Sequence, residues 1–169
     1  MGSLAVRAPE AIARPSKTTI TNSQHHYQLS VDSSAQLDSA QLPDGLLSVA
    51  KLGPLTMTLS RIQGSNIRVW RRNQRAQFIS EILAGVGSRA GVTLESSTFA
   101  KGEKPPVLDL KLSTINSEGK KQIVWMRFLF FRRYALVTSA AVPAKSPRKL
   151  KREAKRYASS LQQWVGTGK

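Results

Sequence analysis

The segment VLDLKLSTINSEGKKQIVWMRFLFF, residues 107–131, decides the fold of this chain. Val107–Ile115 and Gln122–Phe131 are two apolar-rich runs of strand length. The residues Asn116-Ser-Glu-Gly119 between them have the composition of a tight turn. The segment therefore predicts a β-hairpin, and two strands joined by so short a connection require an antiparallel sheet.

The second strand of this hairpin is apolar on both of its faces. One face carries Ile123, Trp125, Arg127, Leu129 and Phe131, and the other carries Val124, Met126, Phe128 and Phe130. A sheet with one wet face needs only one apolar face, so this strand is either covered on both sides or presents an apolar groove. Two predicted helices favour coverage. Arg127 then needs a partner, either within the fold or on a ligand.

Working outward from the hairpin, strand patterns recur along the chain at 24–32, 46–51, 55–62, 92–99 and 134–142. The apolar spacing over 78–86 predicts an amphipathic helix, with Asn73 as its N-cap. Ser146 and Pro147 predict the start of a second helix that runs to about Val165. The apolar stripe of that helix consists of Leu150, Ala154, Tyr157, Leu161 and Trp164.

The resulting order, β-β-β-α-β-β-β-β-α, predicts an α+β domain: a twisted antiparallel sheet of about six to seven strands with two helices. Residues 1–23 lack periodicity and are predicted to form a flexible arm before a single domain over 24–166. The chain has no cysteine, and its two histidines are adjacent, so we expect neither a metal nor another cofactor. The ten carboxylates show no pairing suited to catalysis, which favours a protein that is not an enzyme.

No apolar stretch is long enough to cross a membrane as a helix. The N-terminus also lacks a basic segment followed by an apolar block, which favours a cytoplasmic protein. A start at Met1-Gly2-Ser3 that replaced a removed signal would instead fit an exported one.

The net charge of +16 is confined to residues 61–169, which hold 22 Lys and Arg against 6 Asp and Glu. Such an excess repels itself in the folded state and indicates a polyanionic partner. The first concentrated cluster lies at the start of the first helix and comprises Arg68, Arg71, Arg72 and Arg75. Exposed helical N–H groups beside these guanidinium groups would form an anion site. Alternatively, these arginines are solvated, or Ile67–Trp70 is a short strand and the helix starts later.

The second cluster follows Lys145 on the last helix and comprises Arg148, Lys149, Lys151, Arg152, Lys155 and Arg156, with Glu153 as the one acid. Like charges four residues apart destabilise a helix, so this face favours an anionic partner over a merely solubilising role. Because one continuous positive surface would suit one extended partner, we predict that both clusters lie on the same side of the sheet.

The last predicted strand contains Tyr134 and Leu136, ends near Pro143 and leads into the C-terminal helix. This arrangement, over about residues 54–165, resembles the PsbP/Mog/DcrB-like superfamily. The resemblance implies a mostly non-enzymatic role, since members include photosystem-associated lumen proteins, a Ran-binding protein and the Eag chaperones that hold effector segments for secretion. The strong basicity of this chain departs from many of these relatives.

These observations predict a non-catalytic binding or adaptor protein that engages an acidic protein partner, in an assembly or a secretion system. The anion-binding residues would be the two arginine and lysine clusters together with Arg127. The alternative is a nucleic-acid-binding protein that grips phosphates through the same basic faces. In that case Trp70, Trp125 and Tyr134 could stack on bases. The near-neutral N-terminal arm counts against the alternative, because a basic tail is the usual device for gripping phosphates.

Overall fold

The computed structural model describes residues 17–38, 42–64, 69, 71–86 and 91–164. Its elements are β1 (Lys17–Asn22), β2 (Tyr27–Asp32), β3 (Gln36–Asp38), β4 (Leu46–Leu52), β5 (Leu55–Gln63), α1 (Arg72–Val86), β6 (Thr93–Ala100), β7 (Val107–Ile115), β8 (Lys121–Phe130), β9 (Tyr134–Pro143), α2 (Arg148–Ser159) and β10 (Gln162–Gln163). The α+β class and the order of the predicted elements are confirmed. None of the described helices combines the length and the hydropathy that crossing a bilayer demands.

The larger sheet has seven strands in the order β3-β4-β5-β9-β8-β7-β6, and all of its neighbouring strands are antiparallel. The predicted hairpin is its β7–β8 pair, in which Leu112 lies opposite Val124. Its turn is closed by the Asn116 side chain, whose Oδ1 accepts from the N–H groups of Glu118 (3.0 Å) and Lys120 (2.8 Å). Gly119 has a φ of 75°, a conformation that side chains other than glycine disfavour.

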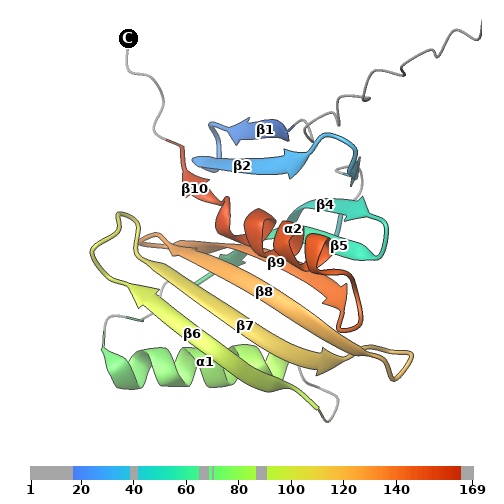
Figure 1. Cartoon of the computed structure of the whole chain (residues 1–169). Coiled ribbons are helices and arrows are strands. Elements are labelled where there is room, and N and C mark those ends of the chain that lie inside the picture. Colours follow the sequence, from blue (N-terminus) through green and yellow to red (C-terminus); the bar gives the residue numbers. More distant parts are fainter. Residues whose placement is uncertain (1–16, 39–41, 65–68, 70, 87–90, 165–169) are drawn as a thin grey trace, which may run out of the picture.

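A second sheet has the order β1-β2-β10 and lies on the far side of α2 from the larger sheet (Figure 1). Its strand β1 corrects the prediction of a flexible arm over 1–23, because Lys17–Asn22 pairs along its full length with β2. The remainder of the predicted arm, residues 1–16, lies outside the described residues. Thr18, Ile20 and Thr21 are residue types that favour strands. Because β1 is mostly exposed, its sequence does not alternate between apolar and polar residues, and no strand was predicted there.

The second helix is shorter than predicted, since α2 ends at Ser159 and not near Val165. Its Ser160 C-cap turns the chain away, with the Ser160 N–H donating to the Tyr157 carbonyl (3.0 Å). The Ser30 N–H in turn donates to the Ser160 hydroxyl oxygen (3.2 Å). Beyond this point the chain enters β10 beside β2, and Leu161 stays buried although it is no longer helical.

The two helices cover opposite faces of the larger sheet (Figure 1). Phe78 of α1 packs edge-on against Phe128, with ring centroids 5.3 Å apart, on the face that carries Val124 and Phe130. The apolar side of α2 packs on the opposite face, which carries Leu129 and Leu136. The strand at 122–131 is therefore covered on both sides, as predicted from the presence of two helices. The prediction that both basic clusters lie on one side of the sheet is wrong, because a strand that is apolar on both faces requires a helix on each.

Candidate functional site

The solvent face of α2 is the most concentrated basic surface among the described residues. Ala154, Tyr157 and Ala158 are buried between the two sheets, and this fixes the rotation of the helix about its axis. Burial raises the pKa of Tyr157 and keeps its hydroxyl neutral. The same rotation turns the predicted basic residues outward: Arg148, Lys149, Arg152, Lys155 and Arg156 are exposed and Lys151 is half-buried.

The charge of this face is hardly compensated. Arg156 Nη1 lies 2.8 Å from Glu153 Oε1, and among the described residues this is the one ion pair that α2 makes. The first turn of α2 contains no acid, and no side chain caps its N-terminus. Arg148, Lys149 and Lys151 therefore stand at the positive end of the helix dipole, where cations are disfavoured.

The nearest acid on the neighbouring sheet is already engaged by its own loop. The Ser34 hydroxyl and backbone N–H both donate to Asp32, and these bonds are the main reason that the pKa of this carboxyl is lowered. The charges of Lys149 and Lys17 add a smaller effect in the same direction. Asp32 therefore stays ionised, and as the one acid in the strands of the small sheet it offsets only a small part of the positive charge of α2.

A shallow hollow of about 390 Å³ opens on this face of the helix. It is lined by Lys149, Arg152, Glu153, Lys155, Arg156 and Ser159. Arginine and lysine donors that converge on one hollow can share a carboxylate or phosphate oxygen. The arrangement can bind anions, but it offers no general acid or base.

The first predicted cluster, at α1, is only partly a free surface. Arg71 and Arg72 are exposed, whereas Arg68 lies outside the described residues. Arg75 has partners within the fold, since its guanidinium lies 4.4 Å from the centroid of the Phe99 ring and its Nη1 donates to the Val69 carbonyl (3.0 Å). Asn73 is not the N-cap, because the helix already begins at Arg72.

Arg127 finds its partner inside the fold. Its Nε and Nη2 donate to the two carboxylate oxygens of Asp109, each at 2.8 Å, and its Nη1 donates to the Ser159 carbonyl at 2.7 Å. The bidentate pair joins β8 to β7, and the third bond holds the C-terminal end of α2 onto the sheet. Arg127 thus has a structural role that accounts for its position among apolar neighbours.

The aromatic residues that could stack on bases are engaged elsewhere. The Tyr134 ring stacks on the Phe131 ring, with their centroids 4.7 Å apart. The Arg61 guanidinium lies 4.4 Å from the centroid of the Tyr134 ring. Trp125 is half-buried and packs against the core on the α2 side of the sheet. Trp70 lies outside the described residues. These contacts leave neither Trp125 nor Tyr134 as an open stacking surface.

Sequence reasoning missed a cluster around Arg61. Arg61 Nη1 lies 3.4 Å from His25 Nδ1, and its buried Nε has no hydrogen-bond partner among the described residues. Burial is the main reason that the pKa of His25 is lowered, with the charge of Arg61 second and His26 third. His25 lies in the turn between β1 and β2, 36 residues from Arg61 of β5, so no local pattern signals their contact. Within the described part of the chain, no group of three His, Asp or Glu side chains could hold a metal ion.

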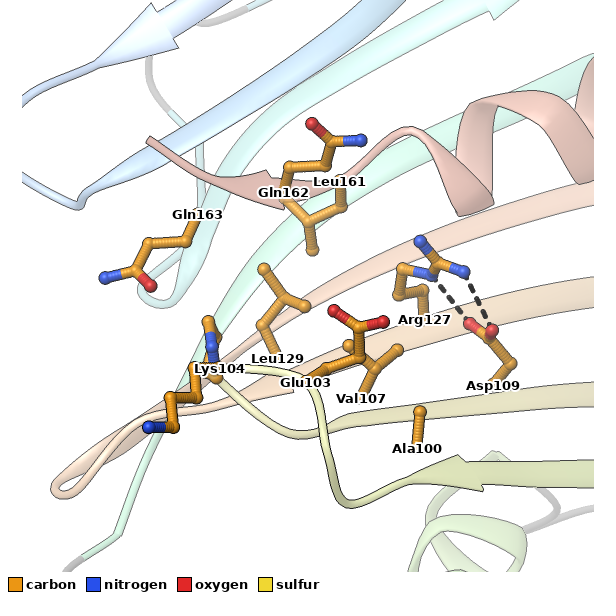
Figure 2. A pocket seen from close by; sticks show the side chains of 11 residues that line it. Ala100, Glu103, Lys104, Val107, Asp109, Arg127, Leu129, Leu161, Gln162 and Gln163 are labelled. Atoms are coloured by element: carbon orange, nitrogen blue, oxygen red, sulfur yellow. Dashed lines mark hydrogen bonds and ion pairs between the residues drawn. The ribbon is translucent and has the colours of Figure 1, made fainter. Parts of the chain in front are cut away.

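A second pocket, which the sequence also did not indicate, lies between β10 and the larger sheet (Figure 2). Its volume is about 390 Å³. Val107, Leu129 and Leu161 supply apolar walls, while Gln162, Gln163 and the β6–β7 loop (101–106) border the opening. The Arg127–Asp109 pair closes one side.

No protein-family model and no curated protein sequence matches this chain. Solved structures do match it. The cyanobacterial PsbP (CyanoP) from Synechocystis sp. PCC 6803 superposes with a TM-score of 0.64 at 8% identity, over 97% of this chain and 99% of that one. LpqN, involved in cell envelope biogenesis of Mycobacterium tuberculosis, gives 0.56 at 14% identity, over 89% and 91%. A protein from Bacteroides thetaiotaomicron VPI-5482 gives 0.54 at 12% identity, over 92% of this chain and 51% of that one.

These likenesses show that the chain has a PsbP-like fold, and they confirm the structural side of the resemblance seen in its sequence. Identities this low show the fold alone.

Proposed function

We propose that this protein is a non-catalytic binding or adaptor protein that engages an acidic protein partner through the basic face of α2, in an assembly or a secretion system. The observation that carries the proposal is the uncompensated charge of α2, where six lysines and arginines face a single acid. Like-charge pairs four residues apart, such as Arg148 with Arg152, destabilise the helix that carries them. An acidic partner would relieve that repulsion on binding.

The charge on the face of α2 is better suited to steering a partner during its approach than to forming tight, specific contacts. A concentrated field of one sign raises the rate of encounter with an oppositely charged surface and fixes its orientation. Arg75 and Arg127 are bound within the fold, and α1 lies on the other face of the sheet. We therefore propose the face of α2 alone as the interface, rather than one surface that spans both clusters.

An acidic protein fits this face better than a nucleic acid does. Binding of single strands commonly adds base stacking on exposed aromatic rings, and Trp125 and Tyr134 are already packed. A nucleic-acid partner would then depend on phosphate contacts alone, and its binding would weaken steeply with salt.

The test compares two triple charge reversals with equal change in net charge. One places glutamate at Arg148, Arg152 and Lys155, and the control places it at the exposed residues Lys51, Arg72 and Lys121. Binding of labelled polyglutamate and of a single-stranded RNA is followed by fluorescence anisotropy. We expect the α2 variant to lose about tenfold or more of the polyglutamate affinity and the control to lose much less.

Equal losses in both variants would show that α2 is not the interface. Binding of RNA in preference to polyglutamate, with a loss of about 10³-fold between roughly 50 and 200 mM salt, would replace the acidic protein by a nucleic acid.

A further inference from the structure

The pocket between β10 and the larger sheet lies outside the proposed interface and has its own recognition chemistry. Ala100 and Val107 are half-buried and give the inner part of the pocket its accessible apolar surface, while Leu129 and Leu161 are almost fully buried in its wall and Glu103 also lines it. The charges of Arg127 and Asp109 neutralise each other through two hydrogen bonds. A volume of about 390 Å³ is within the range of pockets that hold ligands. The inner part is therefore suited to an apolar group.

The outer edge of β10 offers unpaired backbone groups at the mouth of this pocket. The Trp164 N–H donates to the His26 carbonyl (3.0 Å), which makes these two residues a hydrogen-bonded pair. Such pairs alternate along an antiparallel ladder with pairs that are not hydrogen-bonded. Gln163 and Tyr27 lie opposite each other in a pair that is not hydrogen-bonded, so the N–H and C=O groups of Gln163 point away from β2. Neither group has a backbone partner among the described residues.

The lining of the pocket contains Lys104 and Glu103 from the β6–β7 loop, and the exposed residues next to it are mostly basic. Lys101 and Lys104 are exposed on the β6–β7 loop, and Arg132 and Arg133 are exposed on the turn between β8 and β9. The Phe130 N–H donates to the Pro106 carbonyl (3.1 Å), which ties this loop to the end of β8 and sets the two basic segments side by side (Figure 1). Within these two segments, 101–106 and 131–133, Glu103 is the one acid.

We propose that this pocket binds an extended acidic segment of another protein, which pairs with the outer edge of β10 and inserts one apolar side chain into the pocket beside Ala100 and Val107. The backbone of the segment would bond to Gln163 as an added strand does. Its acidic residues on either side of the anchor would lie against the basic loops. The anchor supplies a selectivity that the open basic face of α2 lacks.

The experiment uses two labelled nine-residue peptides, each with acidic residues on both sides of a central position that is leucine in one and serine in the other. Affinities for the full chain are measured by fluorescence anisotropy at low salt. We expect the leucine peptide to bind at least about tenfold more tightly, as burial of one leucine side chain predicts. Equal affinities, or no binding of either peptide, would overturn the proposal.

Two variants locate the binding. Ala100→Trp fills the pocket from β6, and its control, Ala84→Trp, places the same side chain on an exposed position of α1. Gln163→Pro removes the outward N–H without removing a bond to β2, and its control, Gln163→Ala, keeps that N–H. We expect Ala100→Trp to abolish the preference for leucine and Gln163→Pro to weaken the leucine peptide about threefold to tenfold. Both controls should match the unmodified chain.

Retention of the leucine preference by a folded Ala100→Trp variant would show that the pocket is not the site. If the Ala100→Trp variant fails to fold, the Gln163→Pro variant decides instead: an unchanged affinity for the leucine peptide would overturn the proposal. The α2 triple reversal should leave the ratio of the two affinities intact, which separates this inference from the proposed function.

Discussion

Replacement of Arg127 by methionine tests whether the bidentate pair holds α2 to the sheet. Methionine keeps most of the apolar stem but loses the two bonds to Asp109 and the bond to the Ser159 carbonyl. Hydrogen bonds to charged groups contribute about 1.5–3 kcal/mol when buried. The side chains of Arg127 and Asp109 are 21% and 39% exposed, so water screens part of this interaction. We expect a loss of about 2–3 kcal/mol in the free energy of unfolding.

Urea unfolding followed by circular dichroism measures this loss, together with Asp109→Asn and the double variant. At about 2–4 °C per kcal/mol for a chain of this size, the melting temperature of Arg127→Met should fall by about 4–12 °C. The double variant should be more stable than the sum of the single losses predicts, by about 1–2 kcal/mol. Additive losses, or a single variant as stable as the unmodified chain, would refute the role assigned to the pair.

Two further predictions concern the core and the response to pH. Phe128 is fully buried against Phe78, so Phe128→Ala should lower the unfolding free energy by about 3–5 kcal/mol in a urea titration, and a loss below about 1 kcal/mol would contradict the packing of α1 on this face. In the folded state the pKa of His25 is lowered from 6.5, so the unfolded chain binds more protons than the folded chain does. The free energy of unfolding should therefore decline as the pH falls from 7.5 through 6.5 toward the lower folded pKa. His25→Gln should flatten that decline in urea titrations between pH 7.5 and 5.5, and an unchanged slope would show that His25 is not responsible.

The central hairpin could be predicted because its signals are local. The alternation over 107–115 and the turn at 116–119 lie within one stretch of chain, and β7 has the predicted boundaries. The register of this hairpin also identifies the partner of Arg127, because a hairpin closed at this turn places Asp109 opposite Arg127.

The features that escaped prediction depend on contacts between distant parts of the chain. Leu161 and Trp164 continue the helical spacing of α2, but the helix ends because Ser160 bonds to Ser30, which is 130 residues away. The strand β10 has only two residues, too few for any periodicity. The charge pattern alone does not determine on which faces the two basic clusters lie, whereas the two apolar faces of β8 require a helix on each side.

The small sheet has a consequence for the order in which the chain folds during synthesis. Its central strand β2 is synthesised before every strand of the larger sheet, yet its partner β10 and the helix beneath it come from the last part of the described chain. Until they emerge, Tyr27, Leu29 and Val31 lack Tyr157, Ala158 and Leu161, which complete the core that they share. Closing so long a loop carries an entropic penalty before any contact offsets it. We expect β1 and β2 to remain open to chaperones and proteases until α2 and β10 have been synthesised, and then to close last over α2.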